Sequence, residues 1–462
     1  MTNRRVTIVL ILLSFMYLSL IGYLTYVELV QSEMLVSHSS NQRNSDSEDI
    51  ARRGNITDIN GVVLAKSVDS VRYYPYKGMY AHIIGYNSTQ YQRSNLEKTY
   101  NDQLLAVSKI SKVLGTSGKE YGNSLVLTID HSLQEYAYRL LGDNNGCIIA
   151  IEPKTGAIKA MVSKPDFDPN DEALKENWNV LVEDEASPFV ARATSGLYAP
   201  GSTFKLLTAL SAIENGYGDM IFEDEGEVEI GGMIFKNQGD AKNGTIDLKT
   251  GFAKSSNVVF CTLGEKLGGW ELYDMATRFG FNDTFTFDLE YQPSKFPEKI
   301  TDDAHVASLA MGQGEMLATP LQMAMVTCGI ANEGIIMKPY LVDSVVSYEN
   351  KVVKKYKPAK LYEASDYEDT SEVVDMMVET VKSGTGRTWN EIRGITVAGK
   401  TGTSENEYTD SYNMQHTWFV SFAPAYNPEI VVVVMMEYSG GSGGGNCAPI
   451  AKDVIKKYLK NS

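Results

Sequence analysis

The chain has 462 residues, of which 43% are hydrophobic and 22% charged, and its formal net charge is −16 at pH 7. These proportions are those of a folded protein of two or three domains, not of a disordered chain. The negative charge argues against a surface for nucleic acid or anionic lipid. Four widely spaced cysteines without a CxxC pair exclude a disulfide scaffold and the usual zinc spacings. One disulfide, or a zinc site completed by His305 or His416, stays open, although apolar surroundings favour buried free thiols.

The N-terminal segment is apolar and long. Residues 6–27 carry no charge and follow Arg4 and Arg5. About 20 such residues cross a bilayer as a helix. The alternative is a cleaved signal peptide, but its apolar region would be about 7–15 residues long and would end in a small-x-small site, which is missing here. We therefore expect a cytoplasmic tail at 1–5, an uncleaved single-pass anchor at 6–27, and the remainder outside the cell membrane by the positive-inside rule.

Residues 28–123 are polar and rich in tyrosine, with short apolar runs. Residues 52–65 predict a strand, an Asn60–Gly61 turn and a second strand. Residues 94–114 predict a helix, with Ser94 and Glu97 as a capping box. Because no catalytic pattern occurs here, we interpret the segment as a small stalk, or pedestal, domain with a dimerisation-like character that raises the next domain above the bilayer.

Residues 124–462 combine strands at both ends with helices between them. Strands are expected at 124–130 and on both sides of a turn within 146–165, and they return at 394–406, 416–425 and 429–441. Helices are expected at 131–142, at 200–216, from about residue 247 and at the C-terminus. Both ends of the domain therefore supply strands to one sheet flanked by helices, which predicts an α+β fold.

Ser202 and Lys205 form a Ser-x-x-Lys pair at the expected start of a helix, directly after Pro200-Gly201. Residues three apart lie on the same helical face, so the amine can reach the hydroxyl. A lysine with a lowered pKa can take the proton of such a serine and make it a nucleophile. A chain of this length should contain about two such pairs by chance. Only this one is present, and its context fits the chemistry.

Two further motifs follow in the chain. Ser255-Ser256-Asn257 lies in an expected helical segment and is either a helix cap or a hydroxyl and amide that pass protons and hold a substrate amide. Lys-Thr-Gly occurs twice. At 154–156 it follows a proline between two strands and is interpreted as a turn. At 400–402 it lies on an expected strand.

On that strand, Lys400 and Thr401 can bind a substrate carboxylate, and Gly402 lets the substrate backbone approach closely. The backbone N–H of Thr403 would complete an oxyanion hole with the N–H of Ser202.

Ser-x-x-Lys, Ser-x-Asn and Lys-Thr-Gly in this order resemble the penicillin-binding proteins and the serine β-lactamases. The flanking segments resemble the class B penicillin-binding proteins, and the resemblance extends over nearly the whole chain. The segments are RATSGLYAPGSTFK (192–205), MGQGEMLATPLQMA (311–324), VAGKTGTSE (397–405), HTWFVSFAP (416–424), LTIDHSLQEYA (127–137), IEPKTGAIKAMVSKPDFDPN (151–170) and RRGNITDINGVVLA (52–65).

The resemblance implies a peptidoglycan D,D-transpeptidase, with residues 124–462 as a penicillin-binding, serine β-lactamase-like domain. Ser202 would attack the D-alanyl-D-alanine amide with Lys205 as base, and Ser255 would relay a proton to the leaving amine together with Lys400. Asn257 would hold the substrate amide, and Thr401 and Thr403 its carboxylate and acyl region.

No metal and no cofactor is implied. The implied partners are donor and acceptor stem peptides of the cell wall, β-lactam antibiotics that acylate Ser202, and a separate membrane glycosyltransferase. Two alternatives stay open: a membrane-anchored β-lactamase or β-lactam sensor of related fold, and a non-catalytic cell-wall scaffold.

Overall fold

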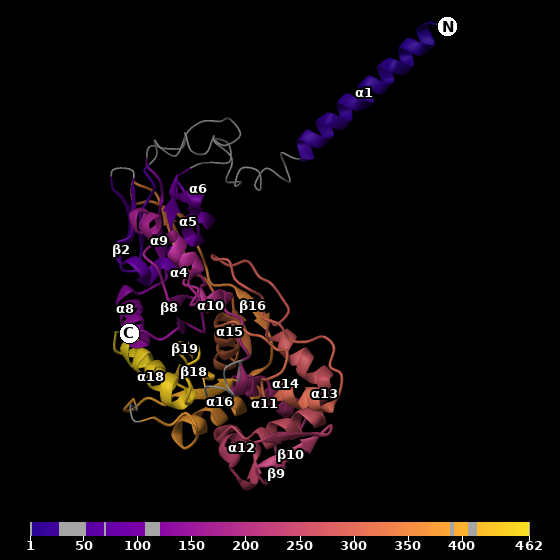
Figure 1. The fold of residues 1–462 in the computed structure, drawn as a ribbon, viewed down its shortest axis with the longest axis vertical. Helices are drawn as coiled ribbons and strands as arrows, with labels where there is room; N and C mark the ends of the chain where they lie inside the picture. The colour runs from indigo at the N-terminus through magenta and orange to yellow at the C-terminus, as the bar shows by residue number, and fades with distance from the viewer. Residues whose placement is uncertain are drawn as a thin grey trace.

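The computed structural model describes residues 2–26, 52–68, 71–106, 121–388, 392–404 and 414–461. The first element, α1 (Thr2–Tyr26), extends away from the folded body in Figure 1. Its stretch Val6–Tyr23 has a mean hydropathy of 2.2 and no buried residue, so this helix is long and apolar enough to cross a membrane. The helix predicted for the anchor is thus confirmed. Residues 28–50, at the start of the predicted stalk, lie outside the described residues.

The folded part nearest α1 is built on a six-stranded sheet with the strand order β15-β14-β6-β1-β2-β3 (Figure 1). The predicted strand–turn–strand unit is confirmed as β1 and β2, with Gly61 at a φ of +87° in the turn. The strands are β1 (Ile56–Thr57), β2 (Val63–Val68), β3 (Val71–Tyr73), β6 (Ser124–Leu127), β14 (Val342–Val346) and β15 (Val352–Lys355).

One expected strand belongs to a different sheet from the one predicted. We expected residues 124–130 to join the central sheet, but β6 pairs with β1 and β14 instead. Its burial alternates along the strand, as fits a strand at this smaller sheet. The pedestal and the domain that follows it in the chain therefore share a continuous sheet.

The predicted capping box at Ser94 is wrong. Two short helices, α5 (Asn95–Thr99) and α6 (Asn101–Leu104), replace the start of the long helix, and residues 107–114 lie outside the described residues. The Ser94 hydroxyl accepts from the N–H of Tyr86 and does not cap α5. Glu97 is instead buried in a salt bridge with Arg53 and Arg72, a long-range pairing that outweighs a local cap.

The central sheet has the order β17-β18-β19-β7-β8 and is antiparallel throughout. Helices α8 (His131–Leu141) and α18 (Gly443–Asn461) cover one face, and α15 (Pro320–Ala331) packs on the other (Figure 1). Burial on both faces explains the unbroken apolar run of β19. The strands are β7 (Gly146–Ile151), β8 (Ile158–Lys164), β17 (Ala398–Ser404), β18 (His416–Ala423) and β19 (Ile430–Met436). This confirms the α+β prediction.

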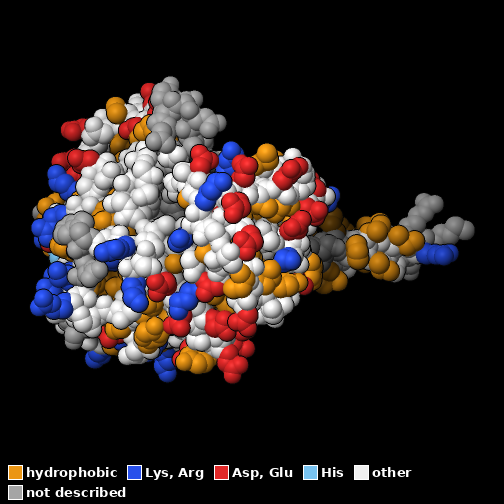
Figure 2. Space-filling view, turned by 90° about the horizontal axis from the view of Figure 1, so that it is seen from below, with side chains coloured by type: hydrophobic (Ala, Val, Ile, Leu, Met, Phe, Trp, Pro, Cys, Tyr) orange, Lys and Arg blue, Asp and Glu red, His pale blue; other side chains and the backbone are white. Residues whose placement is uncertain are grey.

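The middle of the chain supplies most of the helices, as predicted, together with two pairs of strands at the end of the molecule farthest from α1 (Figure 1). The helices are α9 (Asp171–Glu183), α11 (Lys205–Glu214), α12 (Leu248–Lys254), α13 (Asn257–Arg278), α14 (Asp303–Ala310) and α16 (Tyr367–Lys382). The strand pairs are β9 (Ile221–Asp224) with β12 (Gly244–Asp247) and β10 (Glu227–Ile230) with β11 (Met233–Lys236). Seen from this end, Figure 2 shows positive and negative side chains interspersed over much of the surface, with hydrophobic ones in small groups.

Candidate active site

Ser202 lies in a single 3-10 turn, Gly201–Thr203, and α11 begins at Lys205. The predicted helix start after Pro200-Gly201 is confirmed, with Ser202 just ahead of the α-helix. Gly201 has a φ of +53°, and a Cβ there would stand 2.6 Å from the carbonyl oxygen of Thr403. Only glycine therefore lets the Ser202 turn press this closely against β17.

Lys205 is fully buried, and its amine points into the turn between α12 and α13. Lys205 Nζ donates to the carbonyl oxygen of Ser255 at 2.9 Å and to Oδ1 of Asn257 at 2.8 Å, with Oγ of Ser255 at 3.4 Å. In the part of the chain that the structure describes, no hydrogen bond joins Lys205 Nζ to Ser202 Oγ. Such bonds are often long before substrate binds, so the lack of this one does not argue against Lys205 as the base.

Ser255 and Ser256 are in the short connection between α12 and α13, so the helical segment expected from about residue 247 is divided into two helices at this motif. Ser255 ends α12 with a φ of +58°, a left-handed conformation that is uncommon for serine. Ser256 caps α13 by accepting from the N–H of Val259. The predicted cap is therefore present at Ser256, and the proton-transfer role of Ser255 stays a prediction.

Lys400 lies on β17, an edge strand whose neighbour in the sheet is β18. Its buried amine donates to Ser255 Oγ at 2.8 Å. The Ser255 hydroxyl is thus shared by Lys400 and, at the longer distance, Lys205. The other Lys-Thr-Gly, at 154–156, is in the turn between β7 and β8, as predicted.

The two buried amines have lowered pKa values. Burial is the main cause for Lys205 and lowers its pKa from 10.5 to about 7, while Cys261 and Asp224 act in the opposite direction. Burial also lowers the pKa of Lys400 well below its usual value, and the positive charge of Lys205 lowers it further. A neutral amine is therefore available near neutral pH, which a base requires.

Three residues of the site were not predicted from the sequence. Asp224 and Asn237 contact the turn between α12 and α13 from the strand pairs, and Thr385 Oγ1 is 2.6 Å from Thr401 Oγ1. These three residues lie outside the three motifs and belong to no local sequence pattern of their own, so no sequence signal pointed to them.

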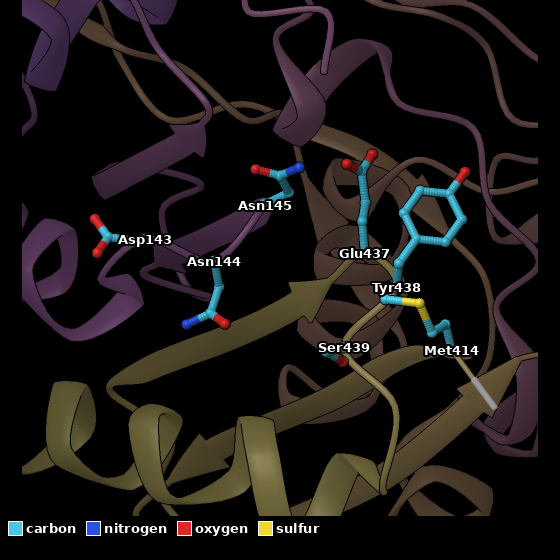
Figure 3. A pocket seen from close by; sticks show the side chains of 7 residues that line it. All are labelled: Asp143, Asn144, Asn145, Met414, Glu437, Tyr438 and Ser439. Carbon is cyan, nitrogen blue, oxygen red and sulfur yellow. The ribbon is translucent and has the colours of Figure 1, made fainter. Parts of the chain in front are cut away.

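A cavity of about 590 Å³ opens at the ends of β7 and β19. Figure 3 shows Glu437 and Tyr438 lining it opposite Asn144 and Asn145. Glu437 also holds the segment that leads to Ser202, because it accepts from Tyr198 Oη at 2.5 Å. None of the motif residues lines this cavity.

Residues 146–456 match the penicillin binding protein transpeptidase domain, and residues 53–116 match the penicillin binding protein A dimerisation domain. The chain belongs to the class B penicillin-binding proteins. Among curated members, it is 31% identical to peptidoglycan D,D-transpeptidase PbpA of Mycolicibacterium smegmatis, over 99% of this chain and 98% of the relative. It is 29% identical to peptidoglycan D,D-transpeptidase MrdA of Acinetobacter baumannii, over 84% of this chain and 66% of the relative.

Solved structures of penicillin-binding proteins share the fold. The ceftriaxone acyl-enzyme complex of penicillin-binding protein A from M. tuberculosis superposes with a TM-score of 0.82 at 29% identity, covering 89% of this chain and 99% of that one. The D,D-transpeptidase domain of a peptidoglycan glycosyltransferase from Eggerthella lenta gives a TM-score of 0.80 at 36% identity, with the same coverage. The class B fold predicted from the motifs is therefore confirmed.

Proposed function

We propose that this chain is a peptidoglycan D,D-transpeptidase that cross-links stem peptides through an acyl-enzyme on Ser202 and is acylated there by β-lactams. The observation that carries the proposal is the Ser255 hydroxyl held between two buried amines, Lys205 and Lys400, beside the turn that bears Ser202. Such an arrangement can move a proton between a nucleophile and a leaving group. The relatives named D,D-transpeptidases and the neighbouring acyl-enzyme complexes support the same activity.

In the proposed reaction, Ser202 Oγ attacks the carbonyl carbon of the D-alanyl-D-alanine amide while neutral Lys205 takes the hydroxyl proton. When the tetrahedral intermediate collapses, the C–N bond breaks and the leaving nitrogen receives a proton through Ser255, supported by Lys400. The terminal D-alanine departs. An acceptor amine then attacks the carbonyl carbon of the Ser202 ester and gives up a proton to the base. The new C–N bond completes the cross-link, the bond to Ser202 Oγ breaks, and the base returns a proton to that oxygen.

The other motif residues would hold the donor peptide. We propose that the N–H groups of Ser202 and Thr403 bind the oxyanion and that Thr401, Gly402 and Thr403 bind the carboxylate and acyl region. The position of β17 as the edge strand of its sheet supports this role, because an extended peptide can add to a strand edge. Asn257 would orient the substrate amide, although its Nδ2 is engaged here with the carbonyl oxygen of Lys236 at 2.7 Å.

We further propose that residues 6–27 anchor the protein with the N-terminus in the cytoplasm, that 28–123 form the pedestal and that 124–462 act on the wall outside. The apolar helix α1 and the two arginines before its apolar stretch support this orientation. Glycan polymerisation would come from a separate membrane glycosyltransferase.

Labelling with fluorescent penicillin tests the proposed nucleophile. The wild-type protein should become covalently labelled, and Ser202→Ala should abolish the label. Ser195→Ala, seven residues earlier in the same segment, is the matched control and should be labelled like the wild type. Persistent labelling of Ser202→Ala would refute the assignment. An acyl-enzyme that lasts minutes or longer indicates a transpeptidase, whereas release within about a second indicates a β-lactamase.

A further inference from the structure

A buried carboxylate, Asp224, lies outside the three motifs at the end of β9. Its Oδ1 accepts from the N–H of Gly226 at 3.0 Å and from Nδ2 of Asn237 at 2.7 Å. Its Oδ2 accepts from Nδ2 of Asn243 at 2.6 Å and from Oγ of Ser256 at 2.7 Å. All four partners are neutral donors, an arrangement that suits a carboxylate, which can only accept hydrogen bonds.

Two of these partners hold the turn that carries the second motif. Ser256 Oγ accepts from the N–H of Val259 and donates to Asp224, so the carboxylate fixes the direction of the capping hydroxyl. Asn237 donates its Nδ2 to Asp224 and therefore turns its Oδ1 toward the N–H of Asn257, at 2.7 Å. Asp224 thus orients both groups that fasten the first turn of α13.

The same turn supplies the acceptors of the Lys205 amine. These are the carbonyl oxygens of Ser255 and Ser256, the hydroxyl oxygen of Ser255 and the side-chain oxygen of Asn257. A shift of the turn would move the amine with it. Asp224 is therefore connected to Lys205 through Ser256, Asn237 and one short piece of backbone, and among the described residues it forms no ion pair or hydrogen bond with the lysine itself.

Asp224 also affects Lys205 through its charge. The titratable groups that shift the pKa of Lys205 are Cys261 on α13 and Asp224, which both raise it, while the charge of Lys205 in turn lowers the pKa of Lys400 on β17. Burial raises the pKa of the Cys261 thiol to about 12, so this thiol is neutral at physiological pH. Asp224 is then the negative charge among these groups. It opposes the lowering of the Lys205 pKa by burial and holds that pKa near neutrality, where a base works best.

We propose that Asp224 is a positioning residue for Ser202 acylation: it holds the Ser255–Asn257 turn in place and supplies the negative charge opposite the buried lysine pair. This inference rests on the proposed function, because it assumes that Lys205 is the base for Ser202.

The experiment measures the second-order rate constant for acylation by fluorescent penicillin between pH 5 and pH 9, in the full-length protein in detergent. Asp224→Asn removes the negative charge of the carboxylate. It also places an amide N–H group among partners that are themselves hydrogen-bond donors. We expect acylation to fall on the order of 10²-fold, the scale of a small misplacement of a catalytic group. We also expect the pH of half-maximal rate to move to lower values, since the charge that favours protonated Lys205 is gone. Ser256→Ala keeps the charge and loosens the turn, so its rate should fall without that shift in pH.

Glu223→Gln is the matched control, because it removes a carboxylate from the adjacent, exposed position of β9 and should leave the rate and its pH dependence unchanged. A folded Asp224→Asn protein whose pH profile superimposes on that of the wild type would overturn the inference. If that variant does not fold, an unchanged acylation rate in Ser256→Ala would overturn it. Failure of the wild type to be acylated, or labelling of Ser202→Ala, would instead refute the proposed function.

Discussion

Replacing Lys205 with arginine keeps a positive charge at the centre of the site but removes the amine that can lose its proton and act as a base. The pKa of Lys205 is lowered by burial to about 7, so about half of the amine is neutral at pH 7. With the ordinary pKa of 10.5 only about one amine in 3,000 would be neutral at this pH. Burial therefore raises the fraction of active base by roughly 10³-fold. Arginine stays protonated at any accessible pH and cannot act as this base.

The expected result is a loss of acylation of about 10²- to 10⁴-fold, the usual contribution of a general base. The assay is the rate of fluorescent-penicillin labelling across pH. In the wild type the rate should rise about tenfold per pH unit below pH 7 and level off above it, because the neutral fraction of Lys205 does so. The midpoint belongs to the coupled pair Lys205 and Lys400 and not to one amine alone.

Lys154→Arg provides the matched control, because this exposed lysine belongs to the Lys-Thr-Gly of the β7–β8 turn. It should leave the pH profile unaltered. If Lys205→Arg keeps a wild-type rate, or keeps the same rise with its midpoint near pH 7, another group takes the serine proton and the reasoning is wrong.

Two other predictions concern contacts farther from the nucleophile. Thr385→Val removes the hydroxyl that meets Thr401, and the loss of about 0.5–1.5 kcal/mol should slow acylation roughly 2- to 10-fold without lowering the melting temperature by more than a few degrees. Glu97→Gln leaves Arg53 and Arg72 without their buried partner and should lower the free energy of unfolding by about 3–5 kcal/mol in denaturant titrations. Burial raises the pKa of Glu97, but the two arginines outweigh burial, so the net pKa is lowered. Its stabilising contribution is therefore present above pH 4.5 and disappears as the pH falls through the lowered value, and acid unfolding of Glu97→Gln should lose this component. Unchanged stability of Glu97→Gln would contradict this view of the triad.

Much of the protein was predictable because the signals were local. An uncharged run at the N-terminus predicts α1, and Pro200-Gly201 before an apolar helical pattern predicts the start of the helix that carries Lys205. The two copies of Lys-Thr-Gly could be told apart by their flanks, since one follows a proline in a turn and the other continues an apolar strand. Hydrogen-bonding and packing preferences over a few residues are sufficient for such predictions.

Other features depended on residues far apart in the chain. The sequence of β6 is compatible with either sheet, and only its pairing with β1 and β14 placed it in the six-stranded sheet. Ser94 and Glu97 have the spacing of a capping box, but two distant arginines bind Glu97 more strongly than the helix end does.

The sequence by itself determined the anchor helix, the order of the three motifs and the identity of Ser202, Lys205 and Lys400 as candidates. The tertiary structure decided which neighbours those residues have. It brought Ser255 between two amines that are 195 residues apart in sequence and placed Asp224 behind the turn that holds them. The physical reason is that a side chain's pKa and orientation depend on burial and on contacts across the fold, which neighbouring residues in the chain do not specify.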